Sequence, residues 1–208
     1  MRHILKYFPD LSVRQRHSFE TMLRLYPQWN AKINVISRKD IDNLEINHLL
    51  HSLAIARFVT FADGSRVLDL GSGGGLPGLP LAAIAPQAHF LLVDRIGKKL
   101  RVAQDIAREA ALTNVEVRHA DIGEVRDRQF DFIVSRAVMD LRQMVPLVRR
   151  LVRHGARSGV PNGLICLKGG DLSDELAPFA ADALVEDIGN YFAELPFFQT
   201  KKLIYLPL

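Results

Sequence analysis

The sequence has little cysteine and no long apolar run, and both shortages exclude classes of protein. Cys166 is the single cysteine among 208 residues, so the chain cannot form an internal disulfide. It lies in the apolar run 164–167, where we expect a buried, unreactive thiol. No apolar run reaches the roughly 20 residues of a transmembrane helix, and the first residues lack the apolar core of a signal peptide. We therefore expect a soluble, cytoplasmic protein that does not bind membranes.

Metal-spaced clusters of cysteine and histidine, and internal repeats, are missing as well. His48 and His51 lie three residues apart in a predicted helix, but no cysteine or third ligand lies nearby in the sequence. We therefore predict no metal site and assign these two histidines to polar surface or capping roles.

The net charge of +4 is concentrated near the N-terminus. Residues 1–66 hold ten Lys/Arg and six Asp/Glu, whereas residues 67–208 hold seventeen of each. A basic surface favours a polyanionic partner through phosphate contacts, but an ordinary solvated surface explains so small an excess equally well.

A turn at residues 63–65 divides the chain into a helical cap, residues 1–62, and a larger part, residues 63–208. Ser12 and Gln15 form a capping box for a first helix, which we expect Pro27 to end, and Asp40 opens a second helix. Basic residues lie opposite the apolar stripe of the first helix: Arg14, Arg16, His17 and Arg24. RNA contact and a solvated helix face explain them equally well.

From residue 67 onward strands alternate with helices. This predicts an α/β fold: a doubly wound, mostly parallel, Rossmann-like sheet of seven strands with helices on both faces. The first strand begins at Val67, and the others are expected at residues 90–94, 115–119, 130–134 and 163–167, with a terminal antiparallel pair near 190–192 and 203–206. We expect a helix that follows the glycine-rich stretch and ends at Ala85, and two more over 98–111 and 174–187. A further helix contains Pro146, which must begin or kink it.

The most informative stretch is the glycine-rich turn after the first strand. Gly71, Gly73 and Gly75 give the pattern G-x-G-x-G, and the helix after the turn offers free N–H groups to a ligand. A dinucleotide-binding turn would carry its third glycine where Leu76 stands, which disfavours a nicotinamide-dependent dehydrogenase. Asp94 follows about 20 residues later, at the end of the second strand, where a carboxylate is placed to accept hydrogen bonds from ribose hydroxyls.

Later strands deliver further residues to the same rim, because the carboxyl ends of parallel strands share one edge of the sheet. The loop after the third strand holds Ile122 and Gly123, and an adenine ring would rest against Ile122. Arg136 follows the fourth strand, where contact with a carboxylate, a phosphate or a base edge is favoured over a plain surface charge. Lys168 follows the fifth strand and is a further candidate for RNA contact.

The sequence resembles the bacterial ribosomal RNA small-subunit methyltransferase G family, also called glucose-inhibited division protein B. The matching residues span nearly the whole chain: Trp29-Asn30 with Asn34, His48-Leu49-Leu50 with Ser52, Gly71 through Leu81, Asp94, Ser135-Arg136-Ala137 and Leu167-Lys168-Gly169. The chain departs from common family residues at three positions: His51, Asp121 and Gly123.

The resemblance implies transfer of a methyl group from S-adenosylmethionine to guanine N7 in the 530 loop of 16S ribosomal RNA of the small ribosomal subunit. It also implies that Gly71 and Leu76 contact the cofactor, that Ile122 and Gly123 lie near the adenine, and that Arg136 lies at the cofactor or target-base pocket. Guanine N7 has an exposed lone pair, so alignment replaces a general base and no conventional catalytic residue is expected. We expect a monomer. The alternatives are a methyltransferase with another substrate and a non-catalytic rRNA-binding assembly factor.

Overall fold

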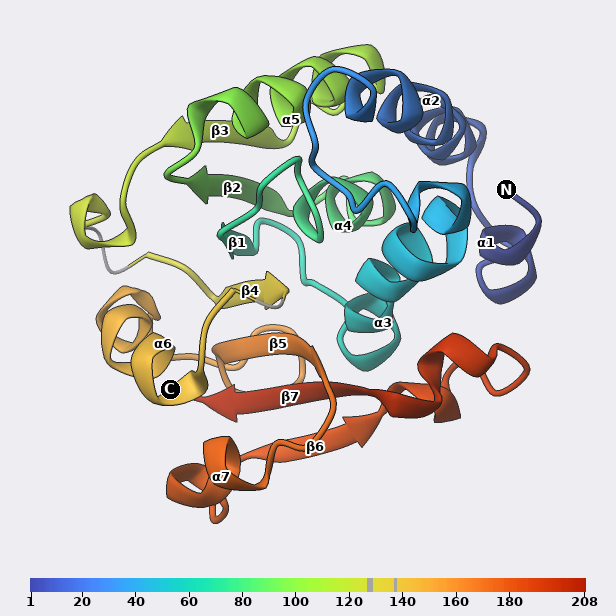
Figure 1. Ribbon diagram of the computed structural model, residues 1–208. Helices are drawn as coiled ribbons and strands as arrows, with labels where there is room; N and C mark the ends of the chain where they lie inside the picture. Colours follow the sequence, from blue (N-terminus) through green and yellow to red (C-terminus); the bar gives the residue numbers. More distant parts are fainter. Residues whose placement is uncertain (127–128, 137) are drawn as a thin grey trace.

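The computed structural model describes residues 1–126, 129–136 and 138–208, and its centre is a seven-stranded sheet (Figure 1). The strand order is β3-β2-β1-β4-β5-β7-β6. The strands are β1 (Arg66–Leu70), β2 (His89–Asp94), β3 (Val115–His119), β4 (Phe132–Arg136), β5 (Gly163–Gly169), β6 (Leu184–Asp187) and β7 (Lys201–Pro207). Only β7 pairs antiparallel with its neighbours, β5 and β6. The predicted mostly parallel sheet with a terminal antiparallel pair is confirmed.

Helices cover both faces of this sheet, as predicted. The α-helices are α1 (Arg2–Tyr7), α2 (Val13–Asn30), α3 (His51–Phe58), α4 (Gly78–Ile84), α5 (Gly97–Glu109), α6 (Leu141–Val148) and α7 (Ser173–Leu176). A π-helical segment, Leu44–Leu50, leads directly into α3. Short 3-10 turns are Ile41–Asn43, Ile122–Glu124, Arg149–Leu151, Ala177–Phe179, Ile188–Asn190 and Pro196–Thr200.

Alternating side chains of the strands build one apolar layer on each face. In β1, Val67 packs with residues of α1 to α5, whereas Leu68 packs with the layer beneath α6. The helices of residues 1–62 therefore share one hydrophobic layer with α4, α5 and the sheet. Cys166 is buried in the other layer, where burial raises the pKa of its thiol to about 12, consistent with the expected inert thiol.

The first long helix begins as predicted and ends later. Ser12 and Gln15 form the capping box, but α2 continues through Pro27 to Asn30. The Trp29 indole donates a hydrogen bond to Asp105 of α5, at 2.8 Å, and Tyr26 is fully buried. Tertiary contacts on both sides of Pro27 thus outweigh its local cost to the helix.

Two predictions for the C-terminal part are wrong. Residues 174–187 do not form one helix: α7 has four residues, and Leu184–Asp187 pairs with β7 as β6. Pro178 interrupts the helical pattern, and the open edge of β7 recruits the segment that follows. The strand expected near 190–192 is also absent, since Ile188–Asn190 forms a 3-10 turn. Pro146 lies inside α6, three residues before the 3-10 turn that begins at Arg149.

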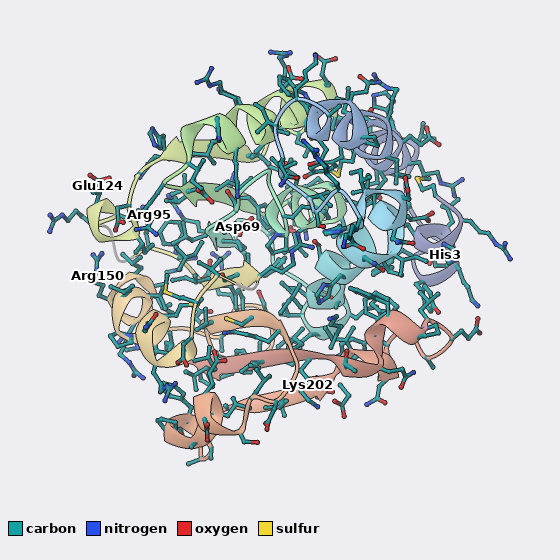
Figure 2. The ribbon with its side chains drawn as sticks, viewed as in Figure 1. His3, Asp69, Arg95, Glu124, Arg150 and Lys202 are labelled. Carbon is teal, nitrogen blue, oxygen red and sulfur yellow. The ribbon has the colours of Figure 1, made fainter. Side chains whose placement is uncertain are left out.

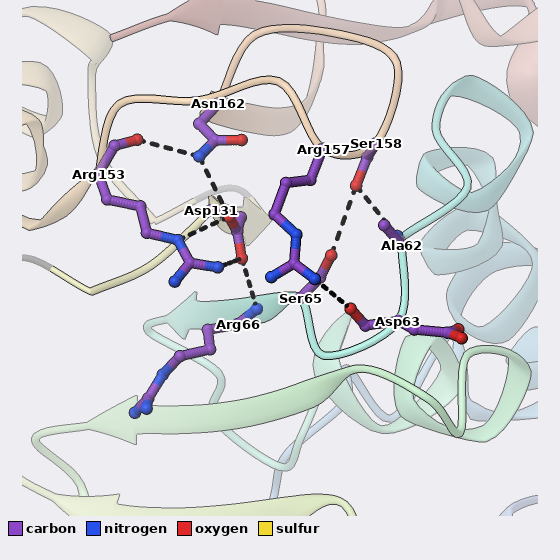
Figure 3. Close-up of polar contacts among 9 residues, drawn as sticks. All are labelled: Ala62, Asp63, Ser65, Arg66, Asp131, Arg153, Arg157, Ser158 and Asn162. Carbon is purple, nitrogen blue, oxygen red and sulfur yellow. Dashed lines mark hydrogen bonds and ion pairs between the residues drawn. The ribbon is translucent and has the colours of Figure 1, made fainter.

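β4 begins two residues later than predicted, because Phe130 forms an isolated bridge with Val152 outside the strand. Between this bridge and β4, the Asp131 side chain forms a cluster of hydrogen bonds, called the staple below (Figure 3). Its buried carboxylate accepts hydrogen bonds from the Arg66 amide at 2.8 Å, from Arg153 Nε at 2.8 Å and Nη2 at 2.6 Å, and from Asn162 Nδ2 at 3.1 Å. The staple therefore ties the start of β1 to the connection between α6 and β5. Nearby, Arg157 donates to the Asp63 carbonyl oxygen at 2.9 Å.

Candidate active site

The glycine-rich turn lies where the strand order of the sheet reverses, after β1. β1 pairs with β2 on one side and β4 on the other, so the loops after these strands diverge and leave a crevice at their carboxyl ends. Gly71, Gly73 and Gly75 have φ values of +69°, +54° and +99°, which disfavour any other residue. A Cβ at Gly71 would lie 2.5 Å from a methyl of Val138. The turn thus depends on glycine for conformation and for space.

The buried carboxylate of Asp69 joins the end of β1 to the start of α4, the two elements that flank this turn. Asp69 is fully buried, and its Oδ2 accepts a hydrogen bond from the Gly78 amide, the first residue of α4, at 2.7 Å. Burial raises the pKa of Asp69 to about 7, although the Gly78 amide and Arg136 oppose the increase. Asp69 Oδ1 and Ser72 Oγ are buried without a hydrogen-bond partner among the described residues. Figure 2 shows Asp69 in the interior of the molecule.

The N-terminal cap forms one wall of the crevice. The Tyr26 hydroxyl donates to the Gly74 carbonyl oxygen at 2.9 Å, and Val35 packs so closely on Gly74 that an added Cβ would lie 2.8 Å from it. The Asn30 side chain fixes this segment, because its Oδ1 accepts from the Val35 and Ile36 amides at 2.8 and 2.9 Å. These contacts were not predicted from the sequence, in which the Trp29-Asn30 match to the family was the one signal for them.

Asp94 ends β2 with its carboxylate directed at the glycine turn. Its Oδ2 accepts a hydrogen bond from the Gly73 amide and its Oδ1 one from the Ile96 amide, both at 2.8 Å. Each oxygen keeps a second lone pair for another donor. The carboxylate therefore braces the turn and remains able to bind a hydroxyl group.

Ile122 and Gly123 lie in a capped 3-10 turn. The Asp121 side chain accepts a hydrogen bond from the Gly123 amide at 2.8 Å, and the Glu124 side chain accepts one from the Asp121 amide at 2.9 Å. Arg150, in the 3-10 turn after α6, fixes this segment because its guanidinium donates to the carbonyl oxygens of Val125 and Ile122 at 2.7 and 3.0 Å. In Figure 2, Glu124, Arg95 and Arg150 lie on one side of the molecule.

Arg136 ends β4 and belongs to a chain of polar contacts from the cap. Its Nη1 lies 3.0 Å from His48 Nδ1, and His48 Nε2 lies 2.5 Å from Asp40 Oδ2. Burial and the Arg136 cation lower the pKa of His48 to about 4, although Asp40 acts in the opposite direction. Burial also lowers the pKa of Arg136. Ala137, the last residue of the Ser135-Arg136-Ala137 motif, lies outside the described residues.

These elements enclose a cavity of about 530 Å³, within the usual range for small-molecule sites. Six predicted cofactor residues line it, namely Gly71, Gly73, Leu76, Asp94, Ile122 and Arg136, whereas Gly123 lies beside it. Lining residues that the sequence analysis missed include Val35, Arg95, Lys99, Val138 and Met139. The positive-φ glycines, the unpartnered buried oxygens and the acidic residue at the end of β2 fit a nucleoside-type ligand.

The predicted RNA contacts lie outside this cavity. Arg14, Arg16 and Arg24 are exposed on α2, and Arg16 Nε donates to the Leu11 carbonyl oxygen at 3.0 Å. Lys168 is almost enclosed: its ammonium group donates to the Met139 carbonyl oxygen at 2.6 Å and pairs with Glu175. Lys168 thus secures the segment before α6, next to the cavity.

No group of three or more His, Cys, Asp or Glu side chains in the described part of the chain is arranged to hold a metal ion. Within the same residues, no helix is long and apolar enough to cross a membrane.

Comparison with known proteins agrees with this geometry. The family GidB, described as rRNA small subunit methyltransferase G, matches residues 15–202. The ribosomal RNA small subunit methyltransferase G of Porphyromonas gingivalis is 54% identical over 99% of this chain and 92% of that protein. The protein of the same name from Bacteroides fragilis (strain ATCC 25285) is 50% identical over the whole of both chains. The fold is similar to that of Aeropyrum pernix fibrillarin in complex with S-adenosyl-L-methionine, with a TM-score of 0.55 and 14% identity over 76% of this chain and 73% of that one. Because the match to the family covers most of the chain, the protein belongs to the rRNA small subunit methyltransferase G family.

Proposed function

We propose that the protein methylates guanine N7 in the 530 loop of 16S ribosomal RNA, with S-adenosylmethionine as the methyl donor. The observation that carries the proposal is the cavity between the glycine turn, Asp94 and Arg136, in a chain about half identical to named rRNA methyltransferases. We further propose that it acts as a cytoplasmic monomer on the small ribosomal subunit.

The bound donor supplies a methyl group whose bond to sulfur breaks, leaving the electron pair on sulfur, as the bond to the guanine N7 lone pair forms. The chain has to position the two reactants, because N7 carries no proton to remove. We assign the ribose hydroxyls to Asp94, the adenine to Ile122 and Gly123, and the methionine end to the turn 71–76. Arg136 then contacts the target base or an anionic group beside it.

The proposal is tested by incubating the protein with labelled S-adenosylmethionine and small subunits that lack the modification, and then mapping the labelled nucleotide. We expect one labelled guanine, in the 530 loop, sensitive to cleavage chemistry specific for N7-methylguanine. Naked 16S RNA and large subunits serve as parallel substrates. Label at another nucleotide would identify a different substrate, and binding of subunits without label would indicate a non-catalytic assembly factor.

Replacing Asp94 with alanine should weaken binding of S-adenosylmethionine about 10- to 100-fold. Loss of hydrogen bonds to a charged acceptor costs about 1.5–3 kcal/mol, and the Gly73 amide also loses its partner. Titration calorimetry measures the dissociation constant. Glu116→Ala removes an exposed carboxylate from the adjacent strand β3 and is the control. Equal affinity of Asp94→Ala and the parent protein would exclude the ribose assignment.

Replacing Arg14, Arg16 and Arg24 together with alanine should weaken binding to small subunits and flatten its dependence on salt. Each lost phosphate contact reduces the slope of log affinity against log salt by about 0.7–0.9. Filter binding over a series of salt concentrations gives the slope. The matched control removes three other exposed arginines, Arg57, Arg66 and Arg157. An unchanged slope in the α2 variant would show that these arginines are ordinary solvated surface.

A further inference from the structure

The contact chain from Asp40 through His48 to Arg136 connects the N-terminal cap to the rim of the cavity. Asn47 Nδ2 donates to Asp40 Oδ1 at 2.6 Å, while Asp40 Oδ2 faces His48 Nε2. His48 lies in the π-helical segment Leu44–Leu50, and its side chain is 12% exposed. π-Helical segments are rare and occur frequently at functional sites.

The chemistry of the partners determines the proton position on His48. A guanidinium group only donates hydrogen bonds, so His48 Nδ1, which faces Arg136, must be the acceptor. The ring is then neutral with its proton on Nε2, which donates to the Asp40 carboxylate. The other neutral tautomer, and the protonated ring, would both place an N–H against the guanidinium N–H.

We infer that His48 and Asp40 are positioning residues for Arg136: they hold its guanidinium at the rim of the cavity in one orientation. The inference rests on the proposed function, which assigns Arg136 to the substrate.

In this arrangement the Arg136 guanidinium keeps N–H groups for a ligand. Among the described residues, the structure shows no hydrogen bond for the Arg136 guanidinium other than that to His48. Its remaining N–H groups are therefore available to a carboxylate, a phosphate or a base edge. Since Asp40 reaches Arg136 through a neutral ring, it orients the cation without forming a direct ion pair that a ligand would have to break.

The surroundings of Arg136 show why an orienting partner matters. The charged and titratable groups that affect it most are Tyr26, Asp69 and Asp40, and His51 lies close enough to feel its charge. The Tyr26 hydroxyl donates to the Gly74 carbonyl oxygen and Asp69 Oδ2 accepts from the Gly78 amide, and neither side chain has a hydrogen bond to the Arg136 guanidinium among the described residues. His48 is thus the group that fixes the direction of the guanidinium.

The test is a double-mutant cycle on methyl transfer to small subunits. His48→Phe keeps an aromatic ring but cannot accept from Arg136, whereas His48→Asn keeps an acceptor near the position of Nδ1. Arg136→Met removes the guanidinium. We expect His48→Phe to lower kcat/KM about tenfold, as loss of one orienting contact does, and His48→Asn to recover most of this loss. In the Arg136→Met background, His48→Phe should cost less than about twofold. Asp40→Ala removes the acceptor that holds the His48 proton on Nε2, so it should lower kcat/KM less than His48→Phe does.

Controls separate positioning from folding and from the proposed function itself. Thermal melting of each variant reports folding, and His51→Phe, a substitution of the neighbouring buried histidine that contacts Phe197 and Phe198, should leave kcat/KM within about twofold. Equal losses from His48→Phe with and without the Arg136 guanidinium would overturn the positioning role. Failure of His48→Asn to recover activity would also count against it. If Arg136→Met itself were fully active, the assignment of Arg136 under the proposed function would fail.

Discussion

Replacing Gly71 with valine is expected to lower the affinity for S-adenosylmethionine by at least about 100-fold. A residue other than glycine costs about 1–2 kcal/mol at positive φ, and a β-branched side chain costs more. In addition, the new Cβ would lie 2.5 Å from Val138, itself a lining residue of the cavity. Relief of either strain shifts the turn that faces the ligand, and a loss of about 3 kcal/mol corresponds to more than 100-fold in affinity.

The matched control for this substitution is Gly159→Val. Gly159 also has positive φ, at +82°, but nothing lies within 4 Å of its added Cβ. It therefore reproduces the backbone strain far from the cavity. Titration with S-adenosylmethionine and thermal melting should show that Gly159→Val loses some stability and keeps its affinity. Comparable affinities of the two valine variants would refute the role of the turn.

Replacing Asp131 with alanine should lower the free energy of unfolding by about 3 kcal/mol. The substitution leaves the Arg66 amide, the Asn162 amide and Arg153 without their acceptor, and removing one partner of a buried pair costs about 3–5 kcal/mol. The lower end applies because Arg153 is 34% exposed. Urea unfolding measures the change. Asp187→Ala breaks the exposed pair with Lys202 and should cost less than about 0.5 kcal/mol.

The same staple gives a dependence on pH with a definite sign. Burial by itself raises the pKa of Asp131, but the hydrogen bonds from Arg153, the Arg66 amide and Asn162 outweigh it and lower the pKa below 3.8. The stabilisation is therefore present above that value and is lost as the pH falls through the lowered pKa. In Asp131→Asn this acid-dependent loss should disappear. If the Asp131→Asn variant lost stability below about pH 4 as steeply as the parent protein does, the role assigned to the Asp131 carboxylate would be contradicted.

Local signals predicted the cavity-lining residues that directly follow a strand. The glycine turn, Asp94 and the loop with Ile122 follow directly from strand ends, and the structure brings them to one cavity. The contacts of Tyr26, Val35 and His48 were missed because they join positions 39 to 88 residues apart and leave no periodic pattern. Among the basic residues after α6, the structure gives Arg150, Arg153 and Arg157 intramolecular partners.

The prediction of secondary structure failed where distant segments decided the outcome. A helix over residues 174–187 satisfies local propensity, yet pairing with β7 converts its second half into a strand. Proline commonly ends a helix, but the burial of Tyr26 and the hydrogen bond from Trp29 to Asp105 stabilise the turn of α2 that follows Pro27. In both cases the decisive partners come from elsewhere in the chain.

The contact between Val35 and Gly74 means that the cap and the donor pocket share a wall. Grafting the first 62 residues of a relative onto this sheet would therefore change a wall of the cavity, and we expect the affinity for S-adenosylmethionine to change with it. Any redesign of the N-terminal cap therefore has to preserve Tyr26, Asn30 and Val35, because these three residues hold the glycine turn and the cavity wall in place.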